Sequence, residues 1–287
     1  MDFDLFDTTT WPVRPLIMGV VNVTPDSFSD GGAYRRWDKA VSHALQLVKD
    51  GADVLDVGGE STRPGAEDVD PEEEIARVVP VIRVLAGETD APISVDTRKP
   101  EVAAAALDAG ARLVNDVGGL RDPAMLELVA STSAGACIMH MPGTPRTMQA
   151  QARYDDVVGE VLAYLGAQAT RALEAGVKDD RLCIDPGIGF GKTLEHNLAL
   201  LAGLDRFASL GYPVVVGASR KRFIEAISGD PVQHRLGGSL AAIADVDRLR
   251  CGIVRVHDVQ ATRQFFQVRA RIHETRTVGT PATKDPD

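Results

Sequence analysis

Three acceptor-rich side chains follow three different apolar runs of the sequence: Asp96, Asn115 and Asp185. Carboxylate and amide oxygens together can bond the N–H edge of a flat heterocycle, such as a guanine-like or pterin ring. Buried carboxylates without such a partner would be costly, although each residue could instead cap a helix or form an ion pair. Metal binding is a rival role, but the His and Cys spacing of zinc sites is absent from the sequence. The three residues therefore predict a binding site for a nitrogen-rich ring.

Basic residues gather at the last two apolar runs, although the chain as a whole is acidic. Its 287 residues carry 31 Lys and Arg against 41 Asp and Glu, a formal charge of −10. Lys221 follows one run, while Arg255 and His257 end the next. Cations concentrated in an acidic chain indicate a local anion site, and barrels often bind phosphate at these loops. Thr62 and Arg63, close to paired glycines, add a hydroxyl and a guanidinium suited to phosphate.

Two further loops belong with these groups. Residues 22–32 form a long polar segment that ends in two glycines, which is typical of a mobile loop over a site. Asn22 offers its amide oxygen to a hard cation such as Mg²⁺. In residues 185–193, Pro186 breaks the Walker A pattern, and the third glycine comes too early for a dinucleotide fingerprint. This glycine-rich turn instead presents Phe190 for stacking.

Other catalytic chemistry has little support. His140 is either a base or a buried histidine with satisfied hydrogen bonds, and the second interpretation is favoured. HExxH, GxSxG and a Cys-His dyad are absent from the sequence, which argues against zinc hydrolysis and acyl transfer. Cys137, Cys183 and Cys251 form no CxxC pair and lie in or beside apolar runs. They indicate buried, reduced thiols in a cytoplasmic protein.

The elements that must position these side chains are short apolar runs that alternate with stretches of helical periodicity. Eight runs predict strands: Leu16–Val21, Val54–Val57, Ile93–Val95, Leu113–Val114, Ala136–Met139, Leu182–Ile184, Pro213–Val216 and Ile253–Val256. A 3.6-residue period predicts helices at Ala40–Asp50, Glu73–Leu85, Pro100–Leu107 and Tyr154–Ala175. This alternation indicates a parallel sheet, and eight strands favour a single α/β (β/α)₈ TIM barrel. A doubly wound open sheet is the alternative.

A polar residue stands at or just beyond the end of each run. The set is Asn22, Asp56, Asp96, Asn115, His140, Asp185, Ser219 and His257. In a barrel the carboxyl ends of all strands meet at one face, where active sites of this fold lie. A helix cap could explain one such residue but does not readily explain eight. We therefore expect the site at this face.

The domain organisation is simple. Residues 1–271 predict one barrel, with the first ten residues as a plug or strand at its base, and residues 272–287 predict a frayed tail. The acidic N-terminus lacks a signal pattern. No apolar stretch approaches the roughly 18 residues that a membrane span needs. The acidic balance argues against nucleic acid as a partner, because phosphate backbones bind basic faces.

Taken together, the motifs resemble the dihydropteroate synthase family of pterin-binding enzymes. NVTPDSFSDGG, GGESTRPG, SVDTRKP, NDV, MHMPGTPRTMQ, DPGIGFGKT, GASRK and RVHD occur in the order found in that family. The resemblance implies a TIM barrel, usually a homodimer. It also implies that p-aminobenzoate is joined to 6-hydroxymethyl-7,8-dihydropterin diphosphate, with Mg²⁺ as cofactor and release of pyrophosphate. Sulfonamides would compete with p-aminobenzoate.

The resemblance further implies a role for individual residues. The pterin would be held by Asp96, Asn115, Met139, Asp185 and Lys221. The diphosphate would be held by Asn22, Thr62, Arg255, Val256 and His257, with Asn22 also binding Mg²⁺. The p-aminobenzoate would lie against Ser61, Thr62, Arg63, Pro64, Phe190 and Lys221. Phe28 and Asp30 would enter from the mobile loop, and the catalytic set would be Asp96, Asp185, Lys221, Arg255 and His257.

The chain departs from the family pattern in two places. Pro142 stands where a long polar residue is more usual, and residues 243–252 are more charged than the family's alanine-rich helix, which affects the expected dimer geometry. Two rival functions are weighed against this one. A methyltetrahydrofolate methyltransferase would not need the TRPG, SRK and RVHD segments, whose presence argues against it, and a silent paralogue should have lost anion ligands, none of which is missing. Whether the chain is a housekeeping enzyme or a sulfonamide-resistance variant stays open.

Overall fold

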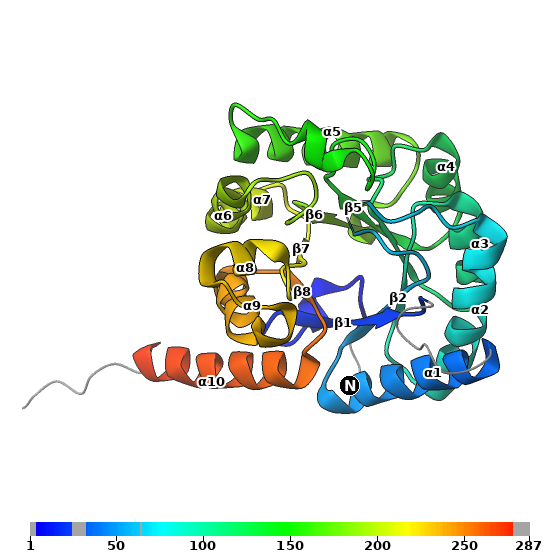
Figure 1. Cartoon of the computed structure of the whole chain (residues 1–287), viewed down its shortest axis with the longest axis horizontal. Helices are drawn as coiled ribbons and strands as arrows, with labels where there is room; N and C mark the ends of the chain where they lie inside the picture. Colours follow the sequence, from blue (N-terminus) through cyan, green and yellow to red (C-terminus); the bar gives the residue numbers. More distant parts are fainter. Residues whose placement is uncertain (1–3, 25–32, 64, 278–287) are drawn as a thin grey trace, which may run out of the picture.

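Eight parallel strands close into a barrel in the computed structural model, which describes residues 4–24, 33–63 and 65–277 (Figure 1). The strands are β1 (Leu16–Asn22), β2 (Val54–Gly58), β3 (Ile93–Asp96), β4 (Leu113–Asp116), β5 (Gly135–Met139), β6 (Leu182–Asp185), β7 (Val214–Val216) and β8 (Gly252–Val256). Each strand pairs with the next in sequence, and β8 pairs with β1. The predicted TIM barrel is confirmed, and the open sheet is excluded.

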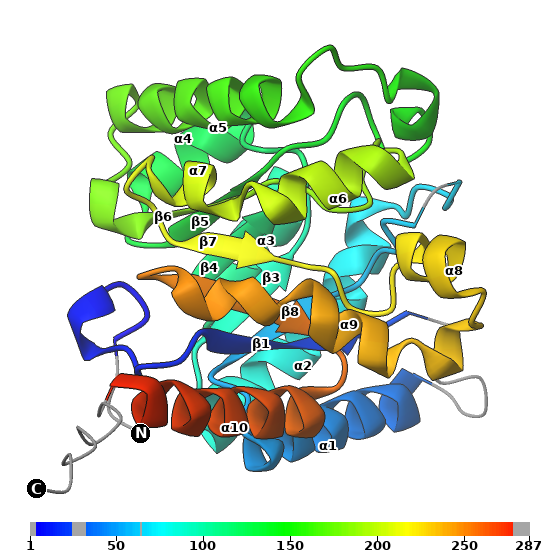
Figure 2. The same ribbon diagram turned by 90° about the vertical axis from the view of Figure 1, so that its left-hand side faces the viewer.

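Helices lie outside the strands (Figures 1 and 2). They are α1 (Ala33–Asp50), α2 (Pro71–Glu88), α3 (Pro100–Asp108), α4 (Pro123–Ser131), α5 (Val157–Glu174), α6 (Leu194–Ala202), α7 (Leu204–Ala208), α8 (Arg222–Ser228), α9 (Leu236–Ala242) and α10 (Val259–Thr277). A proline at the first turn starts α2, α3 and α4, where its missing N–H costs no helical hydrogen bond. None of the helices in the described ranges is long and apolar enough to cross a membrane.

Two boundaries differ from the sequence prediction. Helix α5 begins at Val157 and not at Tyr154, because the Asp156 carboxylate caps the helix by accepting from the N–H of Gly159 at 3.0 Å. The chain beyond Arg271 was expected to be irregular, but α10 continues to Thr277. That part of the tail prediction is wrong for residues 272–277. Residues 278–287 lie outside the described part.

The amino end of the barrel is closed by apolar side chains. Its interior cluster includes Leu16, Met18 and Ile253 from the strands. Leu5, which is 7% exposed, belongs to the same cluster, and Trp11 packs against it. The expected plug at the base is therefore present. Cys137 and Cys183 are register partners on β5 and β6, and both are buried and free, as predicted; Cys251 is also free but only partly buried. Because side chains fill the amino end, a ligand can bind inside the barrel only from the carboxyl end of the strands.

Candidate active site

The carboxyl ends of the strands bring the predicted polar residues together at the barrel mouth. Asp96 on β3 is the register partner of Asn115 on β4, and both are buried. Asn22 ends β1 and lies in register with Gly58, which in turn lies in register with Asp96. Since parallel strands end at one face, residues far apart in sequence become neighbours here. The mouth is the candidate site.

Arg255 lies between two aspartates of the mouth. Its Nε donates to Asp56 Oδ2 at 2.6 Å, and its Nη2 donates to Asp96 Oδ2 at 2.5 Å. Asn115 Nδ2 donates to the same Asp56 oxygen at 3.1 Å. The Asp56 carboxylate can only accept, so the Asn115 amide turns its NH₂ toward Asp56 and leaves its Oδ1 as an acceptor for a ligand. Asp56 thus orients Asn115 and Arg255, which are assigned from the sequence to the pterin and the diphosphate.

Two buried oxygens of this group have no hydrogen-bond partner among the described residues: Asp56 Oδ1 and Asp96 Oδ1. A buried acceptor without a partner costs free energy, and such atoms in a native structure call for a ligand or water. Burial raises the pKa of Asp96 to about 7, against the effect of the neighbouring Arg255, while the Asp56 charge raises it further. A ligand that donates N–H groups to these oxygens would give each of them a partner and would also favour the ionised form of Asp96.

Asp185 and Lys221 face this group from β6 and the loop after β7. Asp185 Oδ1 accepts from the N–H of Gly187 at 2.7 Å. Burial raises the pKa of Asp185, although the Lys221 ammonium opposes the shift. Burial lowers the pKa of Lys221 to about 8. Lys221 Nζ donates to the carbonyl of Ile188 and lies 4.3 Å from the centre of the Phe190 ring, so the two predicted residues are in contact.

An apolar wall completes the pocket beside these charges. Met139, Met141, Met148 and Val117 form a buried cluster, and Phe190 packs against it. Methionine side chains adapt to flat ring systems, as the prediction for Met139 requires. Met139 is the register partner of Asp185, so the wall and the carboxylate share one side of the mouth.

His140 and Lys192 form a buried pair that sequence reasoning missed. Lys192 Nζ lies 3.0 Å from His140 Nδ1 and donates to the carbonyl of Phe190 at 2.8 Å. Burial lowers the pKa of Lys192 to about 7 and the pKa of His140 to about 3. His140 therefore accepts from Lys192, and it is buried with a hydrogen-bond partner, as the favoured interpretation of this residue expects. The only feature of the sequence that could have indicated this pair is the position of Lys192 directly after Gly191 of the glycine-rich turn.

His257 and the loop after β7 form the basic rim. His257 Nδ1 lies 3.0 Å from Ser219 Oγ, and burial lowers the pKa of His257 to about 4, with Arg255 as the next cause. Arg220 adopts a left-handed φ of 58° and forms two hydrogen bonds to Asp258. Arg63 also lowers the pKa of His257, which places the guanidinium within electrostatic reach of this rim. The predicted anion site thus has cations from β8 and from the loop after β2.

The loop after β2 carries the other predicted contacts. Ser61 and Thr62 are half-buried, while Arg63 is exposed. The Ser61 hydroxyl accepts from the N–H of Arg63 at 3.4 Å. Three predicted residues lie outside the described part of the chain: Pro64, Phe28 and Asp30. Their roles stay predictions.

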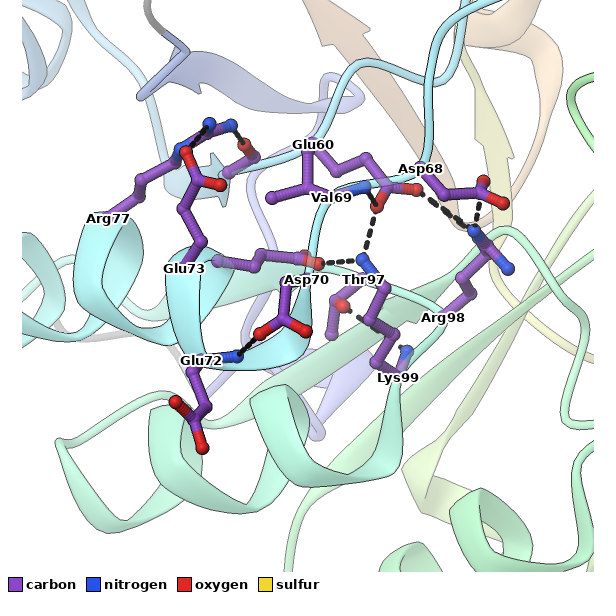
Figure 3. A network of polar contacts seen from close by, with 12 residues as sticks. Glu60, Asp68, Val69, Asp70, Glu72, Glu73, Arg77, Thr97, Arg98 and Lys99 are labelled. Carbon is purple, nitrogen blue, oxygen red and sulfur yellow. Dashed lines mark hydrogen bonds and ion pairs between the residues drawn. The ribbon is translucent and has the colours of Figure 1, made fainter.

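Below this loop, charged side chains form a network that sequence reasoning did not find (Figure 3). Lys99 pairs with Glu60, and Glu60 Oε2 accepts from the N–H of Val69 at 3.0 Å. Arg98 Nη2 donates to Asp68 at 2.7 Å. Burial alone would raise the pKa of Glu60, but the hydrogen bonds from Lys99 and Val69 and the charges of Lys99 and Arg98 together hold it below its usual value.

The donor set for Mg²⁺ is small. Within the described residues, no group of three or more His, Cys, Asp or Glu side chains could hold a metal ion. Mg²⁺ usually keeps several waters and takes one or two protein oxygens together with substrate phosphates. Asn22 supplies one amide oxygen at the end of β1, next to the mouth. The residues therefore fit a Mg²⁺ that arrives with a diphosphate.

Comparisons with known proteins agree with this geometry. The family model of the pterin binding enzymes matches residues 18–257. Over 255 residues the chain is 46% identical to the dihydropteroate synthase of Escherichia coli (strain K12), covering 89% of this chain and 90% of that protein. The Xanthomonas albilineans dihydropteroate synthase, solved with 4-aminobenzoic acid, is 48% identical with a TM-score of 0.85, covering 91% of this chain and 93% of the other. Its structure in complex with 7,8-dihydropteroate gives a TM-score of 0.83 over 92% of this chain and 95% of the other, at 45% identity. A Yersinia pestis dihydropteroate synthase in a sulfonamide complex has a TM-score of 0.86 at 41% identity, covering 93% and 97%.

Proposed function

Because the chain belongs to the pterin-binding enzyme family, and within it to the dihydropteroate synthases, we propose how its barrel mouth performs their reaction. That reaction joins p-aminobenzoate to 6-hydroxymethyl-7,8-dihydropterin diphosphate and gives 7,8-dihydropteroate and pyrophosphate. The observation that carries the proposal is the pair of unpartnered carboxylate oxygens on Asp56 and Asp96 beside the acceptor of Asn115. A pterin ring presents N–H donors on its edge and matches such a set.

The pterin is held by Asp96, Asn115, Asp185 and Lys221, with Met139 against the ring. Asp96 and Asp185 are 8% and 6% exposed, so water competes little for their oxygens. Lys221 Nζ donates to a backbone carbonyl and retains further N–H donors for a ring acceptor. The Phe190 ring next to Lys221 closes the pocket from the side of the second substrate.

The diphosphate lies along the basic rim formed by Arg255, Val256, His257 and Thr62. Nε and one N–H of Nη2 of Arg255 already bond aspartates, which leaves the two N–H groups of Nη1 and the second N–H of Nη2 as donors for phosphate. A neutral His257 faces Ser219 with Nδ1, so its Nε2 edge is available for a phosphate oxygen. Mg²⁺, held by Asn22, would supply charge neutralisation to the diphosphate.

The p-aminobenzoate lies between the loop after β2 and the Phe190 ring. Ser61, Thr62 and Arg63 offer hydroxyl and guanidinium donors to its carboxylate, and Phe190 with Lys221 borders the ring. Pro64, Phe28 and Asp30 belong to the same proposal by resemblance. Sulfonamides would occupy this place and compete with p-aminobenzoate.

Substitution at the pterin methylene follows from the charges around it. The C–O bond to the diphosphate breaks and the bonding pair leaves with pyrophosphate, which the basic rim stabilises. The positive charge that develops on the methylene and ring is favoured by Asp96 and Asp185. The amine of p-aminobenzoate then forms the new C–N bond, and its proton passes to the departing pyrophosphate or to water. Orientation by Phe190 and Lys221 supplies proximity, and no side chain is placed as an obligatory base for the amine.

Pyrophosphate release tests the proposed function. Purified protein is mixed with the pterin diphosphate and Mg²⁺, with and without p-aminobenzoate, and pyrophosphate is measured. We expect release that depends on p-aminobenzoate and is inhibited by a sulfonamide. Tight pterin binding without release would instead support a silent paralogue, and absence of binding would contradict the site assignment.

A homodimer and a cytoplasmic location complete the proposal. Val268 and Ile272 are exposed apolar side chains one helical turn apart on α10, where they line the same surface hollow. We expect a second copy to cover them, which sedimentation analysis would detect as a mass of two chains. The extra charges of residues 243–252 are partly used within the chain, since Asp247 accepts two hydrogen bonds from Arg269 of α10. The free thiols suit a reducing compartment.

A further inference from the structure

Side-chain hydrogen bonds hold both ends of the loop of residues 59–70, which carries Ser61, Thr62 and Arg63 and of which Pro64 lies outside the described part. Arg77 of α2 donates to the carbonyl of Gly59 at 2.8 Å. The Glu60 side chain accepts from the N–H of Val69 at 3.0 Å, so one carboxylate bridges the two ends of the loop. These bonds fix the backbone on either side of the substrate-binding residues.

Lys99 is the centre of this arrangement. It immediately precedes α3, and its Nζ contacts Glu60 and also donates to Glu74 Oε2 at 2.5 Å. The side chains of Lys99, Glu60 and Glu74 are 12%, 7% and 1% exposed. A second link runs from the neighbouring Arg98, which bonds Glu60 at 3.3 Å and Asp68 at 2.7 Å (Figure 3).

This network is poorly suited to a purely stabilising role. Burying ion pairs costs desolvation, and apolar replacements are often neutral or stabilising. Glu74 Oε1 has no partner among the described residues, which adds a further cost. The bonds instead fix the position of the loop relative to the end of β3. They join the loop to residues 98 and 99, which follow the pterin-binding Asp96 by two and three positions.

We propose that Lys99, held between Glu60 and Glu74, is a positioning residue that fixes the 59–70 loop and thereby sets the affinity for p-aminobenzoate. This inference rests on the proposed function, because it assigns Ser61, Thr62 and Arg63 to p-aminobenzoate. The pterin ring lies on the strand ends, and of the loop residues only Thr62 is also assigned to the diphosphate, beside Arg255 and His257. The two substrates should therefore respond differently when the network is removed.

The test uses the double variant Lys99→Met/Glu74→Met, which removes opposite charges together and leaves no lone buried ammonium. We expect the KM for p-aminobenzoate to rise roughly tenfold or more, because small misplacements of positioning groups have effects of this size. The KM for the pterin diphosphate should rise only about two- to threefold, because Arg255 and His257 hold the diphosphate when Thr62 is displaced. Hydrogen exchange of peptides covering residues 59–70 should become faster. The single variant Lys99→Arg keeps the positive charge and should retain most of the affinity for p-aminobenzoate.

A matched control is available at the other end of the barrel, where Arg14 pairs with the buried Asp53. Arg14→Met/Asp53→Asn removes a comparable ion pair and should change neither KM nor exchange in residues 59–70. Equal changes of both KM values in the test variant, or an unchanged KM for p-aminobenzoate, would overturn the proposal. If the wild-type protein released no pyrophosphate, the proposed function would fail, and unchanged loop exchange would still overturn the fixing of the loop by Lys99.

Discussion

The two ends of the barrel bury aspartates in opposite ways. At the amino end, both Asp53 oxygens are satisfied, because Oδ1 accepts from Arg14 Nη2 at 2.9 Å and Oδ2 accepts from Arg14 Nη1 and the N–H of Ile17. At the mouth, Arg255 satisfies one oxygen each of Asp56 and Asp96, and the other oxygen of each has no partner in the described chain. An Arg–Asp contact of the same kind therefore satisfies all carboxylate oxygens at the base but leaves one oxygen of each aspartate without a partner at the mouth. We infer that the base is built for stability and the mouth for a ligand.

The largest effect is expected from breaking the pair at the base. Arg14→Met would leave the Asp53 carboxylate, which is 4% exposed, without its counter-ion. Loss of one partner of a buried pair costs about 3 kcal/mol or more. Urea unfolding should show that loss, while the kcat of the folded enzyme stays unchanged. A loss below ~1 kcal/mol would show that the base does not depend on this pair.

At the mouth, the corresponding change should cost activity and not stability. Asp96→Asn keeps the shape and the acceptor for Arg255 but removes the charge that favours a cationic pterin. We expect about a hundredfold lower kcat, or roughly 2.7 kcal/mol in the barrier, with an unchanged or higher melting temperature. Steady-state pyrophosphate release and thermal unfolding measure the two quantities. An unchanged rate would mean that Asp96 does not favour the developing charge.

A smaller effect is expected from the plug. Leu5→Ala removes part of an apolar side chain that packs into the closed base. The cost should be about 2 kcal/mol, at the lower end for buried leucines, because the segment is near the terminus and can adjust. Chemical unfolding would detect it. Both KM values should stay as in the wild type, since a change in either would mean that the base communicates with the mouth.

A last effect concerns pH. The pKa of Asp96 in the folded protein is raised to about 7, above the value of 3.8 for the unfolded chain. The protonated carboxyl therefore stabilises the free enzyme fully below about pH 4, and this contribution is lost as pH rises through 7. The melting temperature of the wild type minus that of Asp96→Asn should fall by a few degrees between pH 4 and 7. Asp116, whose pKa burial raises to about 6, is present in both proteins and cancels in this difference. A flat difference would contradict the assignment.

The sequence predicted the mouth better than the bonds within it. Asp96, Asn115 and Asp185 were identified because every strand of a parallel barrel ends at the same face, so position along the chain translates directly into position in space. Which of them Arg255 contacts could not be read in the same way. The Arg255 and Asp56 partners are 199 residues apart, and their pairing depends on barrel closure between β8 and β1.

Charged groups behind the site were harder still to predict. Lys192 and His140 are 52 residues apart, and Lys99 and Glu60 are 39 residues apart. In the sequence, each resembles an ordinary surface charge or loop residue. Their burial is decided by how the loops pack on neighbouring helices, which periodicity does not describe. The tail was mispredicted for a related reason, because α10 packs beside α1 and extends past its last clear apolar period (Figure 2).

The most direct test of the central claim is pterin binding to the mouth with one carboxylate neutralised. Calorimetry would compare the affinity for the pterin diphosphate in the wild type and in Asp185→Asn, with Arg14→Met/Asp53→Asn as the control from the base. We predict that Asp185→Asn weakens binding by roughly a hundredfold, as for a charged group lost from a buried bonded site, while its melting temperature is unchanged or higher. The control should bind like the wild type. Equal pterin affinity in Asp185→Asn and the wild type would contradict the claim that the mouth keeps its carboxylates for the ligand.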